Sequence, residues 1–298
     1  MTRSYAPLVA VLSLLWGSSY LLIKVAGREL EPSTMMLIRV VVAGVALLAF
    51  LGVQGQLGEL RRAPPGAYAL GLFNSAIPFT LIAWGERHID SGLAAVVNAS
   101  VPIFAALLAV RWRPSERPRG IRAFGVGLGL VGVIVLTGIA PGGGWLGIAG
   151  VAAVTLASLS YGVSALYGQH LVADVRGPVL STTALIGALV VLVPFGIVQA
   201  PSSFPGWEAI ASVVALALLG TAFAQLLWFR LLRGYGAARS TLVSYLIPAT
   251  ALIYGAVFLS EHVSVAELIG FVLILGGVAL GSGAVRLPRR GLEAVQHP

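Results

Sequence analysis

Two apolar segments of this chain carry a polar side chain four residues before a proline, in NASVP (98–102) and in SYLIP (244–248). A proline inside a helix cannot donate a hydrogen bond to the carbonyl four residues earlier, so the helix bends there. In lipid, the freed carbonyl needs a partner or a wet cavity. We therefore predict that both segments line a solute path, through Asn98, Pro102, Ser244 and Pro248. Alternatively, the two side chains bond only to their own or to neighbouring helices.

Aromatic and hydroxyl side chains share helix faces in two further segments. Trp16 and Tyr20 are four residues apart, and Tyr161 and Ser164 are three apart, so each pair projects from one face of a helix. Such faces offer rings to an apolar group and hydroxyls to a zwitterionic head. In the alternative interpretation, the small hydroxyl residues serve close packing of membrane helices.

Amide side chains interrupt two other apolar segments, at Asn74, which precedes Pro78, and at Gln225. A buried amide is costly unless it is hydrogen-bonded, so each binds either a solute or a neighbouring helix. The predicted substrate-binding residues are Trp16, Tyr20, Asn74, Pro78, Asn98, Pro102, Tyr161, Ser164, Gln225, Ser244 and Pro248.

Arg39 is the sole charge well inside an apolar segment. An arginine at the centre of a membrane helix costs about 2.5–3.5 kcal/mol and is functional by default. Arg39, however, lies about two turns from the end of its segment, near Glu29 and Glu31. We therefore expect its side chain to extend to the membrane surface, as we do for Lys24. The alternative is that Arg39 binds a substrate carboxylate.

Glu86, His88 and Asp90 cluster just after an apolar segment. Histidine titrates near neutrality, so the cluster is a candidate proton-sensitive gate, but a solvated polar loop is the favoured interpretation. No Asp, Glu or His lies in the middle of an apolar segment. Proton-coupled carriers usually keep a buried acid, so we expect facilitated movement of the solute down its gradient.

The composition requires a lipid environment. The chain has 298 residues, of which 58% are hydrophobic and 10% charged, against about 25% charged in soluble domains. Its net charge of +8 comes from residues at the ends of apolar segments, which favours contact with lipid and not with nucleic acid. It has no cysteine, phosphate loop, metal-ligand cluster or nucleophile–base pair, so we expect no cofactor, no metal and no enzymatic activity.

The apolar segments predict an all-α integral membrane protein with ten transmembrane helices. They are placed at 6–25, 33–52, 66–85, 91–111, 121–139, 146–169, 178–199, 208–229, 239–259 and 266–286. With the N-terminus inside, fifteen of the nineteen basic residues lie inside, three lie outside, and Arg39 lies within a span. This asymmetry predicts a multi-pass protein of a bacterial-type inner membrane with both termini in the cytoplasm.

Similar sequences recur about 145 residues apart. WGSSYLLIKV from Trp16 resembles YGVSALYGQH from Tyr161, Pro102 matches Pro248, and Ser115-Glu116 matches Ser260-Glu261. Because each repeat holds five spans, the second must enter the membrane from the opposite side. We predict a first repeat at 1–140, an inverted second repeat at 141–286, and a cytoplasmic tail at 287–298. The two repeats are expected to surround a central cavity.

The WGSSYLLIK segment, the two proline-bearing segments and the glycine-rich fifth and tenth spans resemble the EamA group of the drug/metabolite transporter superfamily. Within that group, the chain is most similar to the YddG-type aromatic amino acid exporters. The resemblance covers almost the whole chain. It implies ten helices around a central cavity and export of small metabolites.

We therefore expect an alternating-access exporter of small amphipathic metabolites, with an amino acid-like substrate and aromatic amino acids fitting best. Export of cationic or hydrophobic drugs is the main alternative, and a membrane-embedded enzyme or a structural subunit would be a different class. Gly125-x-x-x-Gly129 and Gly277-x-x-x-Gly281 favour packing within one chain over dimerisation. The expected state is a monomer or a weak homodimer.

Overall fold

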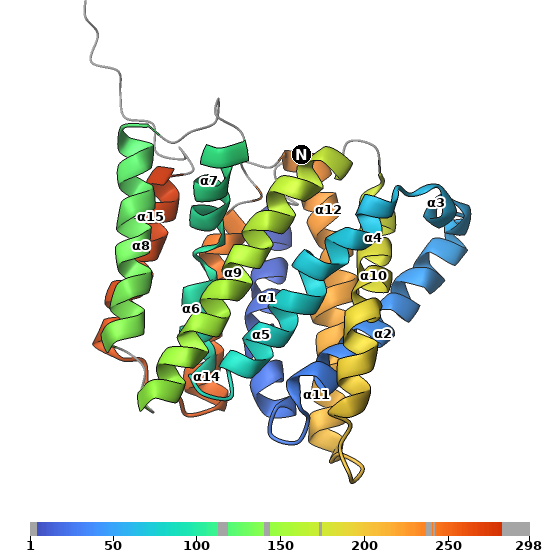
Figure 1. Ribbon diagram of the computed structural model, residues 1–298, viewed down its shortest axis with the longest axis horizontal. Helices are drawn as coiled ribbons and strands as arrows, with labels where there is room; N and C mark the ends of the chain where they lie inside the picture. Colours follow the sequence, from blue (N-terminus) through green and yellow to red (C-terminus); the bar gives the residue numbers. More distant parts are fainter. Residues whose placement is uncertain are drawn as a thin grey trace, which may run out of the picture.

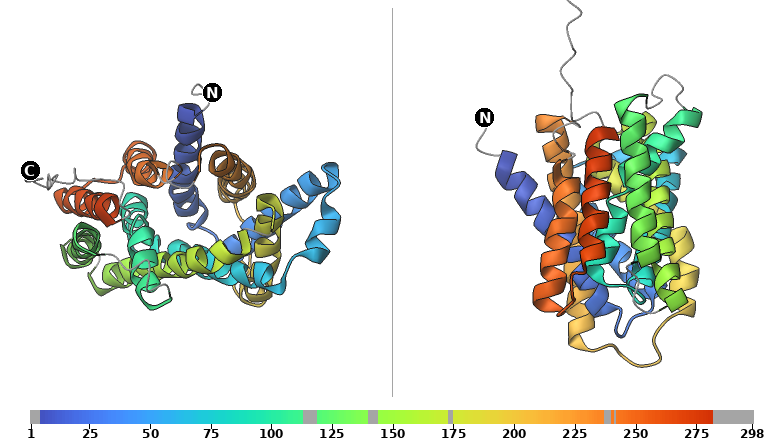
Figure 2. Two further views of the ribbon diagram at one scale, coloured as in Figure 1. Left: turned by 90° about the horizontal axis from the view of Figure 1, so that it is seen from above. Right: turned by 90° about the vertical axis from the view of Figure 1, so that its left-hand side faces the viewer.

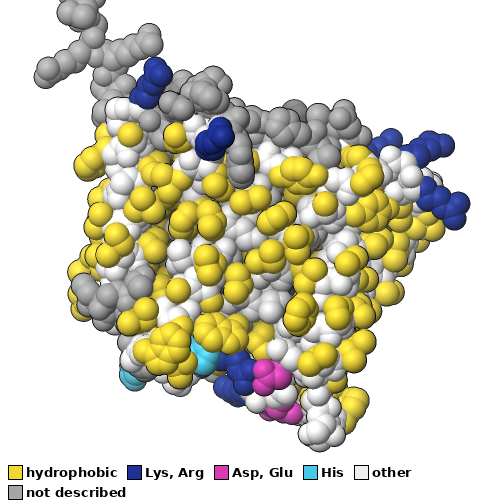
Figure 3. All heavy atoms as spheres, viewed as in Figure 1, with side chains coloured by type: hydrophobic (Ala, Val, Ile, Leu, Met, Phe, Trp, Pro, Cys, Tyr) yellow, Lys and Arg dark blue, Asp and Glu magenta, His cyan; other side chains and the backbone are white. Residues whose placement is uncertain are grey.

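A computed structural model of the protein describes residues 5–112, 119–139, 144–172, 175–236, 240 and 242–281. These residues form helices joined by short connections, and no strand occurs among them. The prediction of an all-α membrane protein is confirmed. Figure 3 shows hydrophobic side chains covering one face of the bundle, with the coloured charged side chains gathered towards its two ends.

Seven helical stretches are long and apolar enough to cross a membrane, and three shorter apolar helices accompany them. The first half contains α1 (Tyr5–Ala26), α2 (Pro32–Val53), α3 (Leu57–Arg62), α4 (Pro65–Gly71), η2 (Leu72–Ala76), α5 (Ile77–Gly85), α6 (Ser91–Asn98), α7 (Val101–Trp112) and α8 (Ile121–Ile139). The second half contains α9 (Gly144–Val172), α10 (Gly177–Val198), α11 (Trp207–Ala217), η4 (Leu218–Phe223), α12 (Ala224–Tyr235), α14 (Leu242–Phe258) and α15 (Val265–Gly281). The count of ten spans stays a prediction.

Three predicted spans are interrupted in the structure. The third is α4–η2–α5 and the eighth is α11–η4–α12, where η2 and η4 are π-helical turns at corresponding positions of the two repeats. The fourth is broken at Ala99 and Ser100, between α6 and α7. Pro102 therefore lies in the first turn of α7, where a missing N–H costs little, and not in the middle of a continuous helix. Pro248, in contrast, lies inside α14 as predicted.

The helix pairs of the bundle are related by exchange of the two halves. α1 packs against α11 and α14, and α9 packs against α5 and α7, while α2 pairs with α10 and α8 with α15. Seen from above, the helices form an elongated array with α8 and α15 at one end and α2 and α3 at the other (Figures 1 and 2). This pairing is what an inverted repeat requires. The repeat boundaries stay a prediction, since residues 140–143 and the tail lie outside the described residues, as does Glu116.

The contact between α8 and α15 depends on glycine. A Cβ atom on Gly277 would lie 2.5 Å from the backbone nitrogen of Gly129, and one on Gly125 would lie 2.5 Å from the nitrogen of Gly281. Glycines spaced four apart let two helix backbones approach this closely. The two glycine motifs thus pack against each other within one chain, as the sequence favoured.

Candidate substrate site

A hydrogen-bonded group of polar side chains joins the two halves within the bundle. The Asn98 side-chain nitrogen donates to the Tyr20 hydroxyl oxygen at 2.8 Å, and the Ser158 hydroxyl donates to the Asn98 side-chain oxygen at 3.1 Å. Tyr20 comes from α1, Asn98 from the end of α6 and Ser158 from α9. We call these three residues the central polar group. In this conformation, Asn98 bonds to neighbouring helices, which is the alternative that the sequence left open.

A second polar contact lies beside the π-helical turn η2. The Ser164 hydroxyl donates to the Asn74 side-chain oxygen at 3.2 Å, and the Ser160 hydroxyl donates to the Phe73 carbonyl at 2.9 Å. A π turn shifts the backbone register and leaves carbonyls in need of donors. Pro78 is buried two residues after this turn. Asn74 and Ser164, predicted from separate patterns, are therefore direct partners.

Trp16 and Gln225 have partners outside the central polar group, whereas Tyr161 packs against the same buried core as Tyr20. Trp16 stacks obliquely on Trp228, with ring centroids 5.4 Å apart, in a separate apolar cluster that includes Leu12 and Leu231. Gln225 accepts a long hydrogen bond of 3.4 Å from the Ser181 hydroxyl. Among the described side chains, none bonds to Ser244, which is half-buried.

Arg39, in α2, is buried within the bundle. The prediction that its side chain extends to the membrane surface is therefore wrong. Its side chain is only 5% exposed. Its Nε donates to the Thr221 hydroxyl oxygen at 2.9 Å, and its guanidinium lies 3.7 Å from the centre of the Phe79 ring. The sequence signal for a buried Arg39 was its position as the sole charge within an apolar span. The sequence favoured a surface position because Glu29 and Glu31 are near Arg39 in the chain. In the structure, Glu29 instead accepts from the Gly206 N–H, and Glu31 pairs with Arg87.

Glu86 is buried, so the prediction of a solvated loop is wrong for this residue. The side chain is 1% exposed, and neither carboxylate oxygen has a hydrogen-bond partner. The nearby Lys24 Nζ donates instead to the main-chain oxygens of Glu86 and Ile89, at 2.6 and 2.7 Å. Asp90 is exposed and His88 is half-buried, as a loop would have them. Burial raises the pKa of Glu86 well above its ordinary value, Lys24 and Arg39 counteract this in part, and Glu261 adds to it.

The end of the bundle that holds Glu31, Glu86 and Glu261 is the one that the arginine count predicts to face outward, and we call it the predicted outer end. Glu261, in the connection between α14 and α15, accepts hydrogen bonds from the backbone N–H groups of Ser91 and Gly92, at 2.9 and 3.2 Å. Its carboxylate thereby caps the N-terminus of α6, where a negative charge is favourable. This contact holds a second-half loop against a first-half helix.

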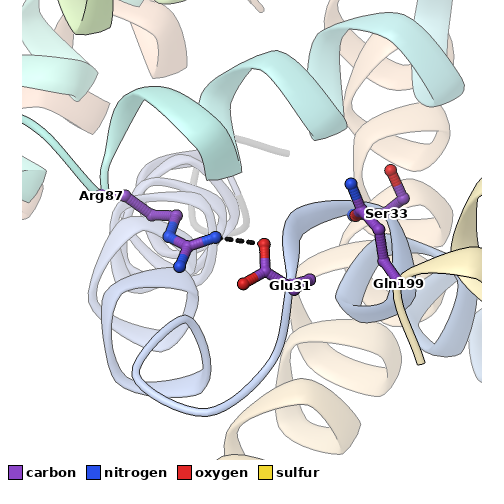
Figure 4. Close-up of polar contacts among 4 residues, drawn as sticks. All are labelled: Glu31, Ser33, Arg87 and Gln199. Carbon is purple, nitrogen blue, oxygen red and sulfur yellow. Dashed lines mark hydrogen bonds and ion pairs between the residues drawn. The ribbon is translucent and has the colours of Figure 1, made fainter. Parts of the chain in front are cut away.

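Further contacts at the predicted outer end join the same two halves. The backbone N–H of Ser33 donates to the Gln199 side chain at 3.0 Å, close to the ion pair between Glu31 and Arg87 (Figure 4). The Thr34 hydroxyl donates to the Gly196 carbonyl at 2.7 Å. A charged cavity of about 350 Å³ opens nearby, lined by Lys24, Arg28, Asp90, Leu259, Ser260, Glu261 and His262.

The buried Glu86 predicts a pH-dependent difference in stability. Its raised pKa means that the carboxyl of the folded protein releases its proton at a higher pH than that of the unfolded chain, which ionises above about pH 4.3. Wild-type stability should therefore fall, relative to Glu86→Gln, as the pH rises above about 4.5 towards the raised pKa of the folded protein. Thermal unfolding in detergent at several pH values measures this, with Glu208→Gln, which removes an exposed carboxylate, as the control. A constant gap between Glu86→Gln and wild type would contradict the prediction.

Apolar helices enclose hydrogen-bonded polar side chains between two matched halves, an architecture that recurs among membrane transporters. The sequence profile of the EamA-like transporter family matches residues 3–138 and again residues 148–282, and the chain belongs to this family. The expected EamA resemblance is confirmed.

Related proteins of known name match over most of their length. The chain is 27% identical to the uncharacterized inner membrane transporter YedA of Escherichia coli, over 90% of this chain and 87% of that protein. It is 30% identical to a probable terminal-alkyne amino-acid exporter of Streptantibioticus cattleyicolor, over 89% of each. A crystal structure that is 20% identical in sequence shares the fold, with a TM-score of 0.67 over 95% of this chain and 98% of the other.

Proposed function

We propose that this transporter exports amino acids with bulky apolar side chains, aromatic ones above all, across a bacterial-type inner membrane with both termini in the cytoplasm. The observation that carries the proposal is the central polar group, which offers an amide and hydroxyls from α1, α6 and α9. The rings of Tyr161 and Phe79 belong to the same buried core as Tyr20. Neutral donors and acceptors beside aromatic surface suit a zwitterion with an apolar side chain.

The name of one relative supports the same class of substrate. The Streptantibioticus cattleyicolor protein is called a probable amino-acid exporter. A terminal-alkyne amino acid combines a zwitterionic head with an apolar tail, so the chemistry needed for its export resembles that proposed here. The aromatic preference depends on the rings of this chain alone.

Alternating access is the proposed mechanism. In the structure, Glu261, Gln199 and Gly196 of the second half hydrogen-bond to the first half at the predicted outer end. Release of a solute to that side requires these contacts to break. Two pseudo-symmetric halves provide the matching state in which the opposite end closes.

Export of cationic or hydrophobic compounds is the second candidate, and Glu86 is the observation that favours it. A buried carboxyl group without a partner favours its neutral form, and a cationic solute beside it would favour ionisation and pair with the resulting carboxylate. Transport without proton coupling was expected because the sequence showed no buried acid. Glu86 is a buried acid, so that argument no longer holds. Facilitated movement stays a prediction.

A counterflow assay tests these proposals. Proteoliposomes containing the purified protein are loaded with unlabelled solute and exposed to labelled phenylalanine, tryptophan, leucine, glutamate or a cationic dye. We expect accumulation of phenylalanine and tryptophan, weaker accumulation of leucine, and none of glutamate. Accumulation of the dye without any amino acid would replace the first proposal by the second.

A further inference from the structure

Arg39 is a buried cation without an anionic partner. It is 5% exposed, and no carboxylate among the described residues lies within ion-pair distance of it. The ion pairs that the described residues do form, Glu31 with Arg87 and Glu59 with Arg176, involve partly exposed side chains. A guanidinium stays charged at physiological pH and is costly to bury unpaired. This charge therefore needs an explanation beyond packing.

Three contacts fix the orientation of the guanidinium. Nε donates to the Thr221 hydroxyl oxygen at 2.9 Å, and one terminal nitrogen lies 3.8 Å from the Met36 sulfur, a weak acceptor. The Phe79 ring lies under the group at 3.7 Å. The hydroxyl of Thr221, which lies in the π-helical turn η4, in turn donates to the carbonyl of Leu216 in α11 at 3.1 Å, so its lone pairs are free to accept from Arg39. A residue of a π turn thus holds the arginine, and such turns are frequent at functional sites.

The remaining N–H groups have no strong acceptor. A guanidinium carries five N–H donors, and Thr221 uses only the one on Nε. The two terminal nitrogens together match the spacing of carboxylate oxygens, which arginine binds in a bidentate manner. The described residues supply no such acceptor for them. They are therefore available to a ligand.

Arg39 lies in the buried core that also holds Tyr20 and Tyr161, because Phe79 and Met36, which contact its guanidinium, belong to that core. Tyr161 and Tyr20 come from α9 and α1, the first helices of the two halves. Glu86 interacts with Arg39 at longer range but forms no ion pair with it. Burial favours the neutral form of the Glu86 carboxyl, so that Glu86 compensates the arginine charge poorly. The guanidinium of Arg39 thus lies against an aromatic ring, and no described carboxylate forms an ion pair with it.

We propose that Arg39 binds the carboxylate of the transported solute, with Thr221 and Phe79 holding the guanidinium in place. The inference rests on the proposed function and restricts the class of solute that the transporter accepts. A solute must carry a carboxylate beside its apolar group, and the corresponding amide or amine is a poor ligand. Arg39 is thereby the residue that selects acids, while the rings of Tyr20 and Tyr161 lie alongside the rest of the solute.

A binding experiment with matched acids and amides tests the proposal. The probes are 3-phenylpropionate, 3-phenylpropionamide, phenylalanine and phenylalaninamide, titrated calorimetrically into the full chain in lipid nanodiscs. The wild type is expected to bind each acid about tenfold or more tightly than its amide. Arg39→Met should abolish this preference and leave amide binding unchanged, and Arg39→Lys should retain part of it. Arg87→Met, which removes an exposed arginine, should behave as the wild type.

Several results would overturn the assignment. Equal binding of acid and amide by the wild type would do so without any variant, as would a preserved preference in Arg39→Met. Loss of both ligands in Arg39→Met would indicate a structural role. If Arg39→Met does not fold, Thr221→Val keeps the charge but releases Nε, and it should reduce the preference severalfold. An unchanged preference in Thr221→Val would then count against the proposal.

The outcome for Arg39 is separable from that for amino acid export. If counterflow detects no amino acid but 3-phenylpropionate binding depends on Arg39, the proposed substrate fails and the carboxylate site stands. If amino acids are exported and Arg39→Met still discriminates against phenylalaninamide, the function stands and the carboxylate site fails.

Discussion

The Asn98→Leu variant is expected to transport at least about tenfold more slowly than the wild type. Leucine removes the amide that joins Tyr20 to Ser158, and it leaves the Tyr20 hydroxyl without its donor in a buried setting. An orphaned buried polar group costs about 1–3 kcal/mol, and about 1.4 kcal/mol corresponds to a factor of ten. Initial rates of counterflow in proteoliposomes, normalised to the amount of monodisperse protein, measure the effect.

Ser244→Leu is the matched control for Asn98→Leu. The two positions are equivalent in the sequence repeat, but only Asn98 is bonded across the halves in the structure. We expect the Ser244 variant to lose less than about threefold in rate, because no described partner is orphaned. Normal transport by Asn98→Leu would remove the central polar group from the site. Equal loss in the two variants would indicate that the solute contacts both positions.

The Gly277→Ala variant is expected to lose about 1–3 kcal/mol of stability, the usual cost of overpacking. A Cβ atom at this position would lie 2.5 Å from the Gly129 nitrogen and 2.7 Å from the Gly125 carbonyl oxygen. Both are backbone atoms, so α8 and α15 must separate to accommodate it. Thermal unfolding followed in detergent should show a lowered midpoint and, with it, a lower yield of folded protein.

Gly276→Ala provides the control from the adjacent residue of the same helix. The nearest atom to a Cβ at Gly276 is the end of the Leu128 side chain, at an ordinary contact distance of 3.7 Å. Alanine is favoured over glycine in a helix by about 1 kcal/mol, so this variant should be as stable as the wild type or more so. If Gly277→Ala were equally stable, the close contact of α8 with α15 would be wrong.

The sequence alone predicted the helical membrane fold, and it did so through strong physical signals. Lipid cannot solvate polar backbone, so a chain that spans it repeatedly must alternate long apolar segments with short polar connections. Composition and segment length are therefore sufficient for the fold class. The π turns η2 and η4 were not predicted, because a π turn changes backbone register without changing hydrophobicity. A bend in the NASVP segment was predicted from Pro102, and the structure has a helix break there, at Ala99–Ser100.

The sequence also indicated which side chains are polar within the membrane, but only the tertiary structure paired them. Asn98 with Tyr20 and Asn74 with Ser164 are partners that lie 78 and 90 residues apart along the chain. Spacing on a single helix cannot predict such pairs. It predicted that Trp16 and Tyr20 share a function because they share a face, yet Trp16 packs on Trp228 and Tyr20 bonds to Asn98.

For the ionisable residues, the tertiary structure was decisive. Near a helix end, an arginine side chain can extend to water or turn inward. A glutamate beside a loop can likewise be solvated or buried. The local sequence is the same in each case. Arg39 turns inward because Thr221 and Phe79, which are distant in the chain, meet it there. Glu86 is buried because neighbouring segments cover it, and Lys24 donates to the loop backbone and not to the Glu86 carboxyl group. Hydrophobicity determines which segments enter the membrane, whereas the packing of helices from both halves determines what each charge meets.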